Sequence, residues 1–515
     1  MADTPDYQSA DYGGRLLTQW NVVDTVLGGA YAMQEAGAEM LFPFPAESDA
    51  AYADRLAQST FDNDYEDVLD AVVGMILRRP VKLGDNVPAR IKANAENIDL
   101  AGTHLNVFAF RLLRKAIHYG DAYVVVDVQR IADDVNTSGE AIDEATARQL
   151  NLRPYWTLYG GAQVQTRPRY VPINGKVTLQ QIVFRELALL PDGVFGEKAV
   201  IRYRVWRLPV QPVGLGGQYV KTGPVEWELW EEQETEGAAP DEAKSVQFIE
   251  SGTVPLDEIP VAPLIANPDV YDPMYTAGPT LYDLARLCVK DYNQQSDHEA
   301  NLHLCSSPIP FTVNLKPEEK DSAQQSWGKT TILDCDEGGM VSYAEPAGTG
   351  LQAMERQLEK NKRQIRRKGF DMLLEGSQIT TTATEQVLRA GRRTSRLAQI
   401  AEAFKDCLER ALQFSAQWYR MGEDAGGEVT LGVKGDELIL TPADIQALSI
   451  QAERKQLSVR TLLSIEKRAG LLPDDVSEDQ ELAQIEDETR RFGALAMEMQ
   501  PPPQPPAPMT TGATA

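Results

Sequence analysis

The chain has 515 residues, 43% of them hydrophobic and 24% charged, and its formal net charge at pH 7 is −26. This composition indicates a folded protein that is too long for one ordinary domain, and it excludes an intrinsically disordered chain. The acidic balance argues against a protein that binds DNA tightly, because tight binding needs many Lys and Arg side chains to displace counterions from phosphates. It still permits a protein that lets DNA pass without gripping it.

No segment approaches the roughly 18 consecutive apolar residues that a membrane-spanning helix needs. The N-terminal sequence MADTPDYQSADYGG is acidic and lacks the basic and apolar pattern of a secretory signal, so we expect an intracellular protein. The cysteines are scattered without a CxxC pair, which favours reduced, partly buried thiols over disulfides or a zinc site. They are Cys288, Cys305, Cys335 and Cys407.

The N-terminal part of the chain is predicted to be helical and then to enter a buried strand. Two helices are expected between 47 and 79, and the second begins with a capping pattern at Asn63. A third helix spans about 103–119 and ends at Gly120, because glycine suits the left-handed position after a helix. The near-continuous apolar run AYVVVDV at 122–128 predicts a buried strand.

From 154 to about 250 the pattern changes to alternating apolar and polar residues between Gly, Pro and Asn turns, which predicts an antiparallel β region. A long helix then runs from about 279 to Cys305. Its second half is polar nearly all round, so it does not suit an ordinary core and fits better in a ring of like helices beside water. The tryptophans expected in the core or on one face of the β region are Trp156, Trp206, Trp227 and Trp230.

A short β module follows the long helix. Its strands are expected at 308–315, 330–335 and 340–345. The last two are predicted to form a hairpin with Gly338 and Gly339 in the turn.

Helices are predicted again at about 351–374 and 383–421, with a run of threonines between them. Thr380 to Thr382 suit a helix interior poorly, because their hydroxyls compete for backbone hydrogen bonds, whereas Thr382 can begin a T-x-x-E capping box. We therefore expect a polar loop between two helices. Beyond the second helix we expect a strand pair near 428–440, short helices to about 499 and a disordered Pro-rich tail.

The second of these helices has apolar residues at alternating spacings of three and four. This spacing is typical of a heptad-like seam that packs against neighbours along about 58 Å. A helix in the core of an all-α domain explains the same spacing equally well. The candidates for a seam between subunits are Val387, Leu397, Phe404, Leu408 and Trp418.

Positive charge is concentrated around the threonine run. Residues 355–396 contain eleven Lys or Arg residues against five acidic ones, in a chain that is acidic overall. One interpretation is a basic patch around a polar loop. The alternative is a solvated helical face whose charges form pairs four residues apart.

No motif in the sequence predicts catalysis, a metal or a nucleotide. The tripeptide GKT lacks a phosphate-loop context, because Ala323 occupies the place of the first glycine. His298 and His303 are five residues apart and do not share a helical face, which disfavours zinc. A calcium-like loop that begins at Asp134 has Ala145 at its twelfth position. We therefore predict a non-enzymatic protein without cofactor or metal, and an unrecognised multidomain enzyme remains a third hypothesis.

The order of elements resembles the central part of tailed-phage portal proteins: a long polar helix, a small β module, a basic helix, a Thr-containing loop and a second long helix. The likeness covers roughly residues 15–420. Over this range the chain resembles one phage family long described as a domain of unknown function and grouped with portals. It carries no catalytic signature. The segments that carry it are SDHEANLHLCSSPIPF at 296–311, GSQITTTATEQVLRA at 376–390, SRLAQIAEAFKDCLERALQFSAQW at 395–418, FPAESDAAYADRLAQSTFDNDYEDVLDAVVGMILRRP at 44–80, NIDLAGTHLNVFAF at 97–110 and YGDAYVVVD at 119–127.

The resemblance implies an α+β fold of the portal type, in which a mixed wing domain with antiparallel strands is joined to long stem helices, a small clip, a spine helix and a helical crown. The implied boundaries are an N-terminal arm at 1–25, the wing at 26–275, the first stem helix at 276–305, the clip at 306–350, the second stem helix at 351–374, the tunnel loop at 375–382, the spine helix at 383–427, the crown at 428–499 and a disordered tail at 500–515.

The resemblance also implies a function. Portal proteins form a homo-oligomeric ring, usually of about twelve subunits, at one capsid vertex, and double-stranded DNA is packaged and ejected through its channel without sequence recognition. Such a ring docks the terminase motor and later a head–tail adaptor, and it contacts the major capsid and scaffolding proteins. The expected location is the virion and, during assembly, the host cytoplasm. The second hypothesis is a ring or scaffold-type virion protein without a DNA channel.

The resemblance assigns site residues by position. Short Thr and Gln side chains on the tunnel loop could touch a moving phosphate backbone without reading bases. The loop residues are Gly376, Ser377, Gln378, Ile379, Thr380, Thr381 and Thr382. The candidates for contact with DNA in the channel are Lys360, Lys362, Arg363, Arg366, Arg367 and Lys368.

Overall fold

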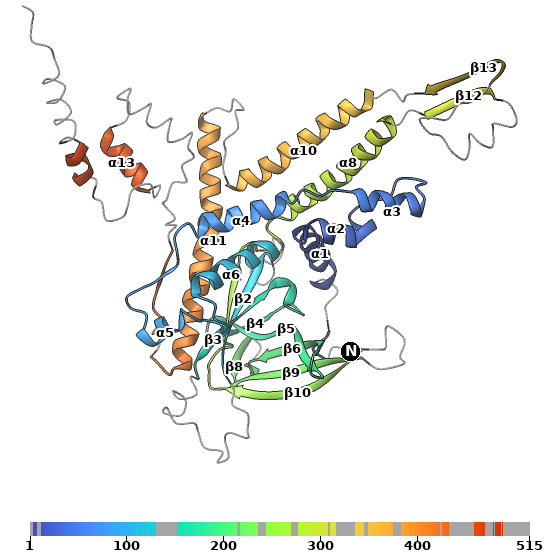
Figure 1. Cartoon of the computed structure of the whole chain (residues 1–515). Coiled ribbons are helices and arrows are strands. Elements are labelled where there is room, and N and C mark those ends of the chain that lie inside the picture. The colour runs from blue at the N-terminus through green and yellow to red at the C-terminus, as the bar shows by residue number, and fades with distance from the viewer. Residues whose placement is uncertain are drawn as a thin grey trace, which may run out of the picture. The chain divides into compact units, whose positions relative to one another are not determined.

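The computed structural model combines helices with mostly antiparallel sheets, which confirms the predicted α+β class (Figure 1). None of the helices it describes has the length and apolar character of a membrane span. The chain divides into two compact units, Met1–Leu373 with Ser395–Val433 and Leu374–Thr394 with Lys434–Ala515. The described residues are 4–7, 12–129, 152–213, 217–234, 244–268, 277–306, 309–315, 335–344, 349–373, 383–422, 425–431, 458–468, 477, 479–485 and 487.

The first unit begins with a helical layer that is already part of its core. Trp20 is 1% exposed, and its indole nitrogen donates a hydrogen bond to the carbonyl oxygen of Tyr119 at 3.0 Å. The range that the resemblance assigns to an N-terminal arm, 1–25, thus contains a core residue, and the arm itself stays a prediction. Asn63 caps its helix as predicted, since its side chain accepts from the Glu66 backbone N–H at 3.3 Å. The elements are η1 Tyr12–Leu16, α1 Leu17–Leu27, α2 Gly29–Ala36, η2 Gly37–Glu39, α3 Asp49–Gln58 and α4 Asp64–Ile76.

A three-stranded antiparallel sheet follows, with β2 at its centre, in the order β11-β2-β3. Helix α6 packs on this region with a buried apolar face and ends, as predicted, at Gly120, whose φ of 97° is left-handed. A side chain at Gly120 would also collide with the backbone, because a Cβ there would lie 2.1 Å from the Gly278 carbonyl oxygen. The elements are β1 Lys82–Leu83, α5 Ala89–Asn94, α6 Leu105–Tyr119, β2 Asp121–Val128, β3 Pro154–Gly160, η4 Gly161–Gln163 and β11 Val261–Ile265.

The β region between β3 and β11 forms a seven-stranded sheet in the order β10-β9-β6-β5-β4-β8-β7. Neighbouring strands are antiparallel except β4 and β8, which are parallel. The two sheets share one apolar core, in which Tyr159 of β3 stacks on Phe184 of β5 at 4.2 Å between ring centroids. Trp206 and Trp227 lie in the same core, as predicted. The strands are β4 Arg169–Ile173, β5 Lys176–Asp192, β6 Gly196–Arg207, β7 Val210–Val213, β8 Gln218–Lys221, β9 Val225–Glu234 and β10 Lys244–Val254.

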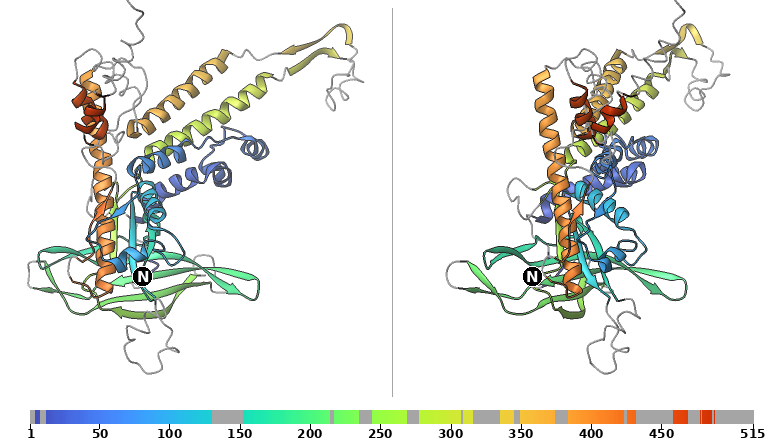
Figure 2. Two further views of the ribbon diagram at one scale, coloured as in Figure 1. Left: turned by 60° about the vertical axis from the view of Figure 1, so that its left-hand side comes forward. Right: turned by 90° about the vertical axis from the view of Figure 1, so that its left-hand side faces the viewer.

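Two long helices, α8 Tyr282–Ser306 and α10 Thr349–Leu373, lie side by side (Figures 1 and 2). Contacts between Asp283 and Lys368 and between Asn301 and Met354 show that they run antiparallel. Both helices were predicted within a few residues of these bounds.

The small β module between α8 and α10 differs from its prediction. It is a two-stranded sheet in which β12 Ile309–Leu315 pairs with β13 Cys335–Ala344. Gly338 and Gly339 lie inside β13, where the pairing register shifts, and not in the turn of a hairpin. The predicted hairpin is therefore wrong, because a glycine pair accommodates a bulge within a strand as readily as a tight turn.

The longest helix in the described part of the chain, α11 Ala383–Trp418, has the predicted start, and its part from Ser395 onward packs into the first unit. Trp418 donates its indole N–H to the Val126 carbonyl oxygen at 2.9 Å, and Trp156 donates to the Ser415 hydroxyl at 3.0 Å. These bonds attach α11 to the three-stranded sheet.

The segment after α11 also belongs to the first unit. Strand β14 Val429–Thr430 pairs with β1, so the strand predicted there has a distant partner, and the first unit extends to Val433. The crown boundary at 428 stays a prediction. In the second unit, α13 Val459–Arg468 is preceded by Ser458, whose hydroxyl accepts from the Thr461 backbone N–H at 3.1 Å. The other half of the predicted strand pair, toward 440, lies outside the described residues.

Candidate nucleic-acid interface

Helix α10 has one packed face. Asn361 and Ile365 are 1% and 2% exposed, and Leu351, Met354 and Leu358 on the same face are half-buried. Their spacings of three and four residues keep them on one side of a helix that turns about 100° per residue. This face lies against α8 and α4.

The opposite face of α10 is a basic stripe. Arg356, Lys360, Arg363 and Arg367 recur at spacings of four, three and four, which gathers them within a sector of about 60°. All four are exposed, and the same helical arithmetic places the centre of this sector almost opposite Ile365. Helix α10 therefore presents positive charge on the side that faces away from its own packing partners.

Acidic residues border the stripe at Glu355 and Glu359 on one side, and Asp371, four residues after Arg367, occupies a helix position on the other. Glu359 pairs with Arg363 at 3.1 Å, and both side chains are well exposed. Such a pair contributes little, because water screens it and the two long side chains lose freedom. It leaves the stripe with a net positive charge.

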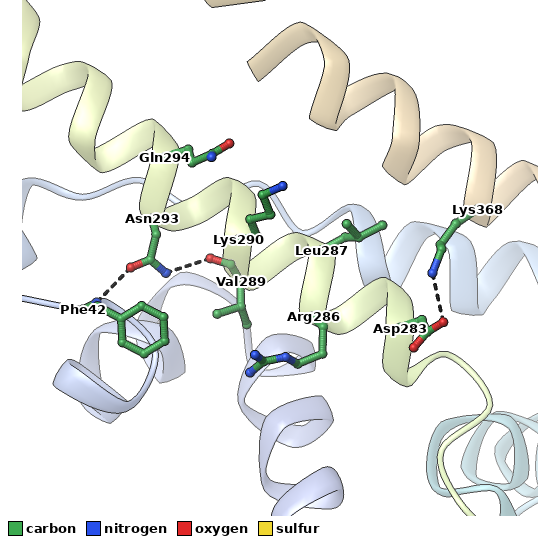
Figure 3. A pocket seen from close by; sticks show the side chains of 9 residues that line it. All are labelled: Phe42, Asp283, Arg286, Leu287, Val289, Lys290, Asn293, Gln294 and Lys368. Atoms are coloured by element: carbon green, nitrogen blue, oxygen red, sulfur yellow. Dashed lines mark hydrogen bonds and ion pairs between the residues drawn. The ribbon is translucent and has the colours of Figure 1, made fainter. Parts of the chain in front are cut away.

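The six cations predicted to contact DNA do not act as one group. Lys362 pairs with Asp62 at 3.0 Å, and this hydrogen bond raises the pKa of the Lys362 ammonium. Lys368 pairs with Asp283 of α8 at 2.9 Å (Figure 3). These two lysines tie α10 to its own chain.

The other four predicted cations are exposed on α10. Lys360, Arg363 and Arg367 lie on the stripe. Arg366 lies nearer Asp64, a half-buried carboxyl whose pKa is raised mainly by burial and lowered by Lys362 and Arg366. Sequence reasoning left Arg356 out of the DNA candidates, although its spacing from Lys360 would have revealed it.

A second group of cations borders a shallow pocket on α8 (Figure 3). Arg286 and Lys290 are exposed there, four residues apart, beside Lys368 of α10. Asn293 fixes the wall of this pocket, since its amide accepts from the Phe42 backbone N–H at 2.8 Å and donates to the Met40 carbonyl oxygen at 2.7 Å. The α8–α10 pair therefore carries positive charge on two of its surfaces.

The predicted subunit seam is placed differently from the stripe. Leu397, Phe404 and Leu408 are buried within their own chain, which matches the alternative of a core helix and leaves them no exposed surface for a second subunit. Trp418 is half-buried against the apolar core that the two sheets share. The side chain of Val387 and the whole tunnel loop, Gly376 to Thr382, lie outside the described residues.

Comparison with known proteins gives one finding for this region. A phage-associated family described as a domain of unknown function, DUF4055, matches residues 280–419. The matched segment extends from the start of α8 to the end of α11 and contains the basic stripe. A search of curated proteins found no match.

Proposed function

We propose that this chain is the subunit of a portal-type ring, a conduit through which double-stranded DNA passes into and out of a capsid. The observation that carries the proposal is the basic stripe of α10, which lies opposite the face of α10 that packs against α8 and α4. The family match to the α8–α11 segment supports it, because this is the part of the chain with the portal-like order of elements.

The size of the stripe suits transit better than capture. Four cations per subunit, if all met phosphates, would give a salt dependence of about 3 to 4 in log affinity against log salt concentration. The chain as a whole carries −26, so DNA outside the stripe would be repelled. Attraction confined to one narrow surface would guide a polyanion without holding it still.

The proposed ring acts without chemistry of its own. Work would come from a docked terminase motor, and capsid, scaffolding and head–tail adaptor proteins would contact other surfaces of the ring. Its proposed place is the portal vertex of a phage virion and, before that, the host cytoplasm. A head-to-tail ring uses two different surfaces of each subunit, so no surface needs to be self-complementary.

Electron microscopy of the purified chain with mass photometry on the same sample tests the ring. Since one chain has a mass of 56.9 kDa, twelve would give a particle of about 680 kDa with an axial hole. Closed particles without a hole would favour the alternative, a scaffold-type virion protein. A uniform monomer or dimer under all conditions would refute the proposal.

A charge series tests the stripe directly. We expect the variant with Arg356, Lys360, Arg363 and Arg367 all changed to Gln to bind a short DNA duplex with a much shallower salt dependence, measured by fluorescence anisotropy. The matched control neutralises four exposed cations on the sheets and on α6, namely Lys82, Arg111, Lys198 and Arg207. Equal loss of binding in both variants would show that net charge matters and the stripe does not.

The tunnel loop is tested by deletion. We expect removal of residues 376–382 to leave ring assembly intact and to impair DNA packaging or DNA retention. Normal packaging by rings of the deletion variant would remove this loop from the proposed channel.

A further inference from the structure

The contact between α8 and α10 has a polar centre. The Asn361 side chain is 1% exposed, and its amide nitrogen donates to Asp291 Oδ1 at 3.1 Å and to Gln294 Oε1 at 2.5 Å. Its amide oxygen accepts from Gln357 Nε2 at 3.0 Å. Both polar atoms of this buried amide are therefore bound, through three directional hydrogen bonds to specific side chains.

Joining two helices through such a centre requires polar groups to lose their contact with water. Asp291 is 5% exposed, and burial raises the pKa of its carboxyl, which the Asn361 hydrogen bond lowers. Apolar residues of similar size at these positions would often stabilise the pair as well or better. Buried asparagines in helix pairs are instead associated with the choice of one register, because other alignments leave their polar atoms unsatisfied.

The remaining contacts of α10 define its rotation poorly. Ile365 is its one apolar side chain with less than a tenth of its surface exposed among the side chains described for this helix. The ion pairs of Lys362 and Lys368 lie on either side of the packed face, but their members are 44% to 81% exposed. Exposed pairs of this kind typically contribute less than about 1 kcal/mol and tolerate many geometries.

The rotation of α10 matters because of what lies on its other side. A shift of one residue turns the helix by about 100°, enough to carry the stripe from the outward direction to the side of the helix pair. We propose that Asn361, held by Asp291, Gln294 and Gln357, is the positioning residue that fixes the rotation of α10 and so the direction in which Arg356, Lys360, Arg363 and Arg367 face. Its consequence for DNA rests on the proposed function, whereas the rotation itself does not.

Spin-label distance measurements test the rotation without DNA. Labels are placed at Gln364→Cys on α10 and Ala71→Cys on α4, which are both exposed positions. Of the native cysteines, Cys305 and Cys335 are changed to Ser, whereas Cys288 and Cys407 are buried and are kept. The full-length protein should give one narrow distance distribution. We expect Asp291→Leu with Asn361→Leu to keep its thermal midpoint within a few degrees but to give a broad or double distribution. Ile365→Leu is the control and should stay narrow.

A second variant guards against misfolding. Gln357→Met removes one hydrogen bond to Asn361 and keeps the bond from Asn361 to the buried Asp291, so it should fold and broaden the distribution to a smaller degree. A narrow, unshifted distribution in both the Gln357→Met and the double-leucine variants would overturn the proposal, as would broadening in Ile365→Leu of the same size. If the double-leucine variant does not fold, Gln357→Met against Ile365→Leu decides.

DNA binding by the same proteins separates the two ideas. If both hold, the double-leucine variant loses at least one unit of salt dependence for a short DNA duplex, with its charged stripe unchanged in sequence. Broadened distances with unchanged DNA binding would support positioning and contradict the DNA role of the stripe. If the parent protein gives one narrow distance distribution but no salt-dependent DNA binding, only the proposed DNA contact is rejected.

Discussion

The body formed by the two sheets and the helix pair α8–α10 are held together by different kinds of contact. In the body, large apolar side chains such as Phe184 and Trp206 are fully buried between the sheets. In the helix pair, the centre of the contact is Asn361 against Asp291, and ion pairs border it. Apolar burial is strong but non-directional, whereas hydrogen bonds are weaker in net terms and directional.

This difference assigns separate tasks to the two regions. The body should provide most of the free energy of unfolding and depend little on salt. The helix pair should add little to global stability but should be sensitive to single polar changes that alter orientation. A surface that presents charge in a fixed direction gains more from the second kind of contact than from the first.

The largest expected effect is in the body. Phe184→Ala removes a ring that stacks on Tyr159 at 4.2 Å and lies edge-on to Tyr123 at 5.9 Å. We expect a loss of about 3 to 5 kcal/mol in the free energy of unfolding, measured with denaturant. Leu187→Ala on the same strand, where the side chain is 71% exposed, should change it by less than about 0.5 kcal/mol. Equal losses of stability in the two variants would contradict the burial of Phe184 in a core between the two sheets.

One polar group in the body should make its stability depend on pH. Burial raises the pKa of Asp121 to about 7, with the Tyr123 hydroxyl as a hydrogen-bond donor at 2.7 Å. Because the folded state keeps this proton to a higher pH than the unfolded state does, its contribution is most favourable below about pH 4 and is lost as pH rises toward 7.

Substitution of this aspartate gives the measurement. Asp121→Asn should remove that loss. The free energy of unfolding of the variant should exceed that of the parent by about 2 to 4 kcal/mol at pH 8, and this advantage should be smallest near pH 4. Thermal melts across this range compare the two proteins. Parallel stability curves would show that Asp121 titrates normally.

The next effect concerns the helix pair. Asn361→Ala leaves the buried carboxylate of Asp291 without its amide donor, which we expect to lower local stability by about 1 to 3 kcal/mol. Hydrogen exchange should accelerate in α8 and α10 and stay unchanged in β2 and β6. Uniform acceleration throughout the first unit would mean that the helix pair and the body unfold together.

The smallest effect concerns the ion pairs at the border. Lys362→Ala should cost less than about 1 kcal/mol, because both partners of the Lys362–Asp62 pair are substantially exposed. A double-mutant cycle with Asp62→Ala, repeated at high salt, isolates the pair. A coupling that persists at high salt would show that this contact is stronger than its exposure indicates.

Local features were predictable where local chemistry decides the structure. The helix that starts after Asn63 and the one that ends at Gly120 follow from residues next to those ends. The stripe could also have been found, since its four residues recur at helical spacing. The pairing of β12 with β13 and of β1 with β14 was missed, because strand partners far apart leave no mark on either segment alone.

Two features of the candidate site needed the structure. Leu397, Phe404 and Leu408 have the same spacing whether they face their own core or a second subunit, and only their burial distinguishes these cases. Asn361 looks like one polar residue among many on a charged helix. Nothing in the sequence places it against Asp291, whose own position on α8 depends on how the two helices align.

The late position of α11 in the chain has a consequence for synthesis. The Val126 carbonyl oxygen accepts from the indole of Trp418, which is synthesised 292 residues later. At typical rates of translation this interval lasts about 15 to 60 seconds, during which β2 and β3 lack α11, and β11 is made only partway through it. A nascent chain interrupted before α11 would expose apolar surface that this helix covers in the complete protein. Quality control at the ribosome would therefore encounter an incomplete fold for most of the synthesis of this protein.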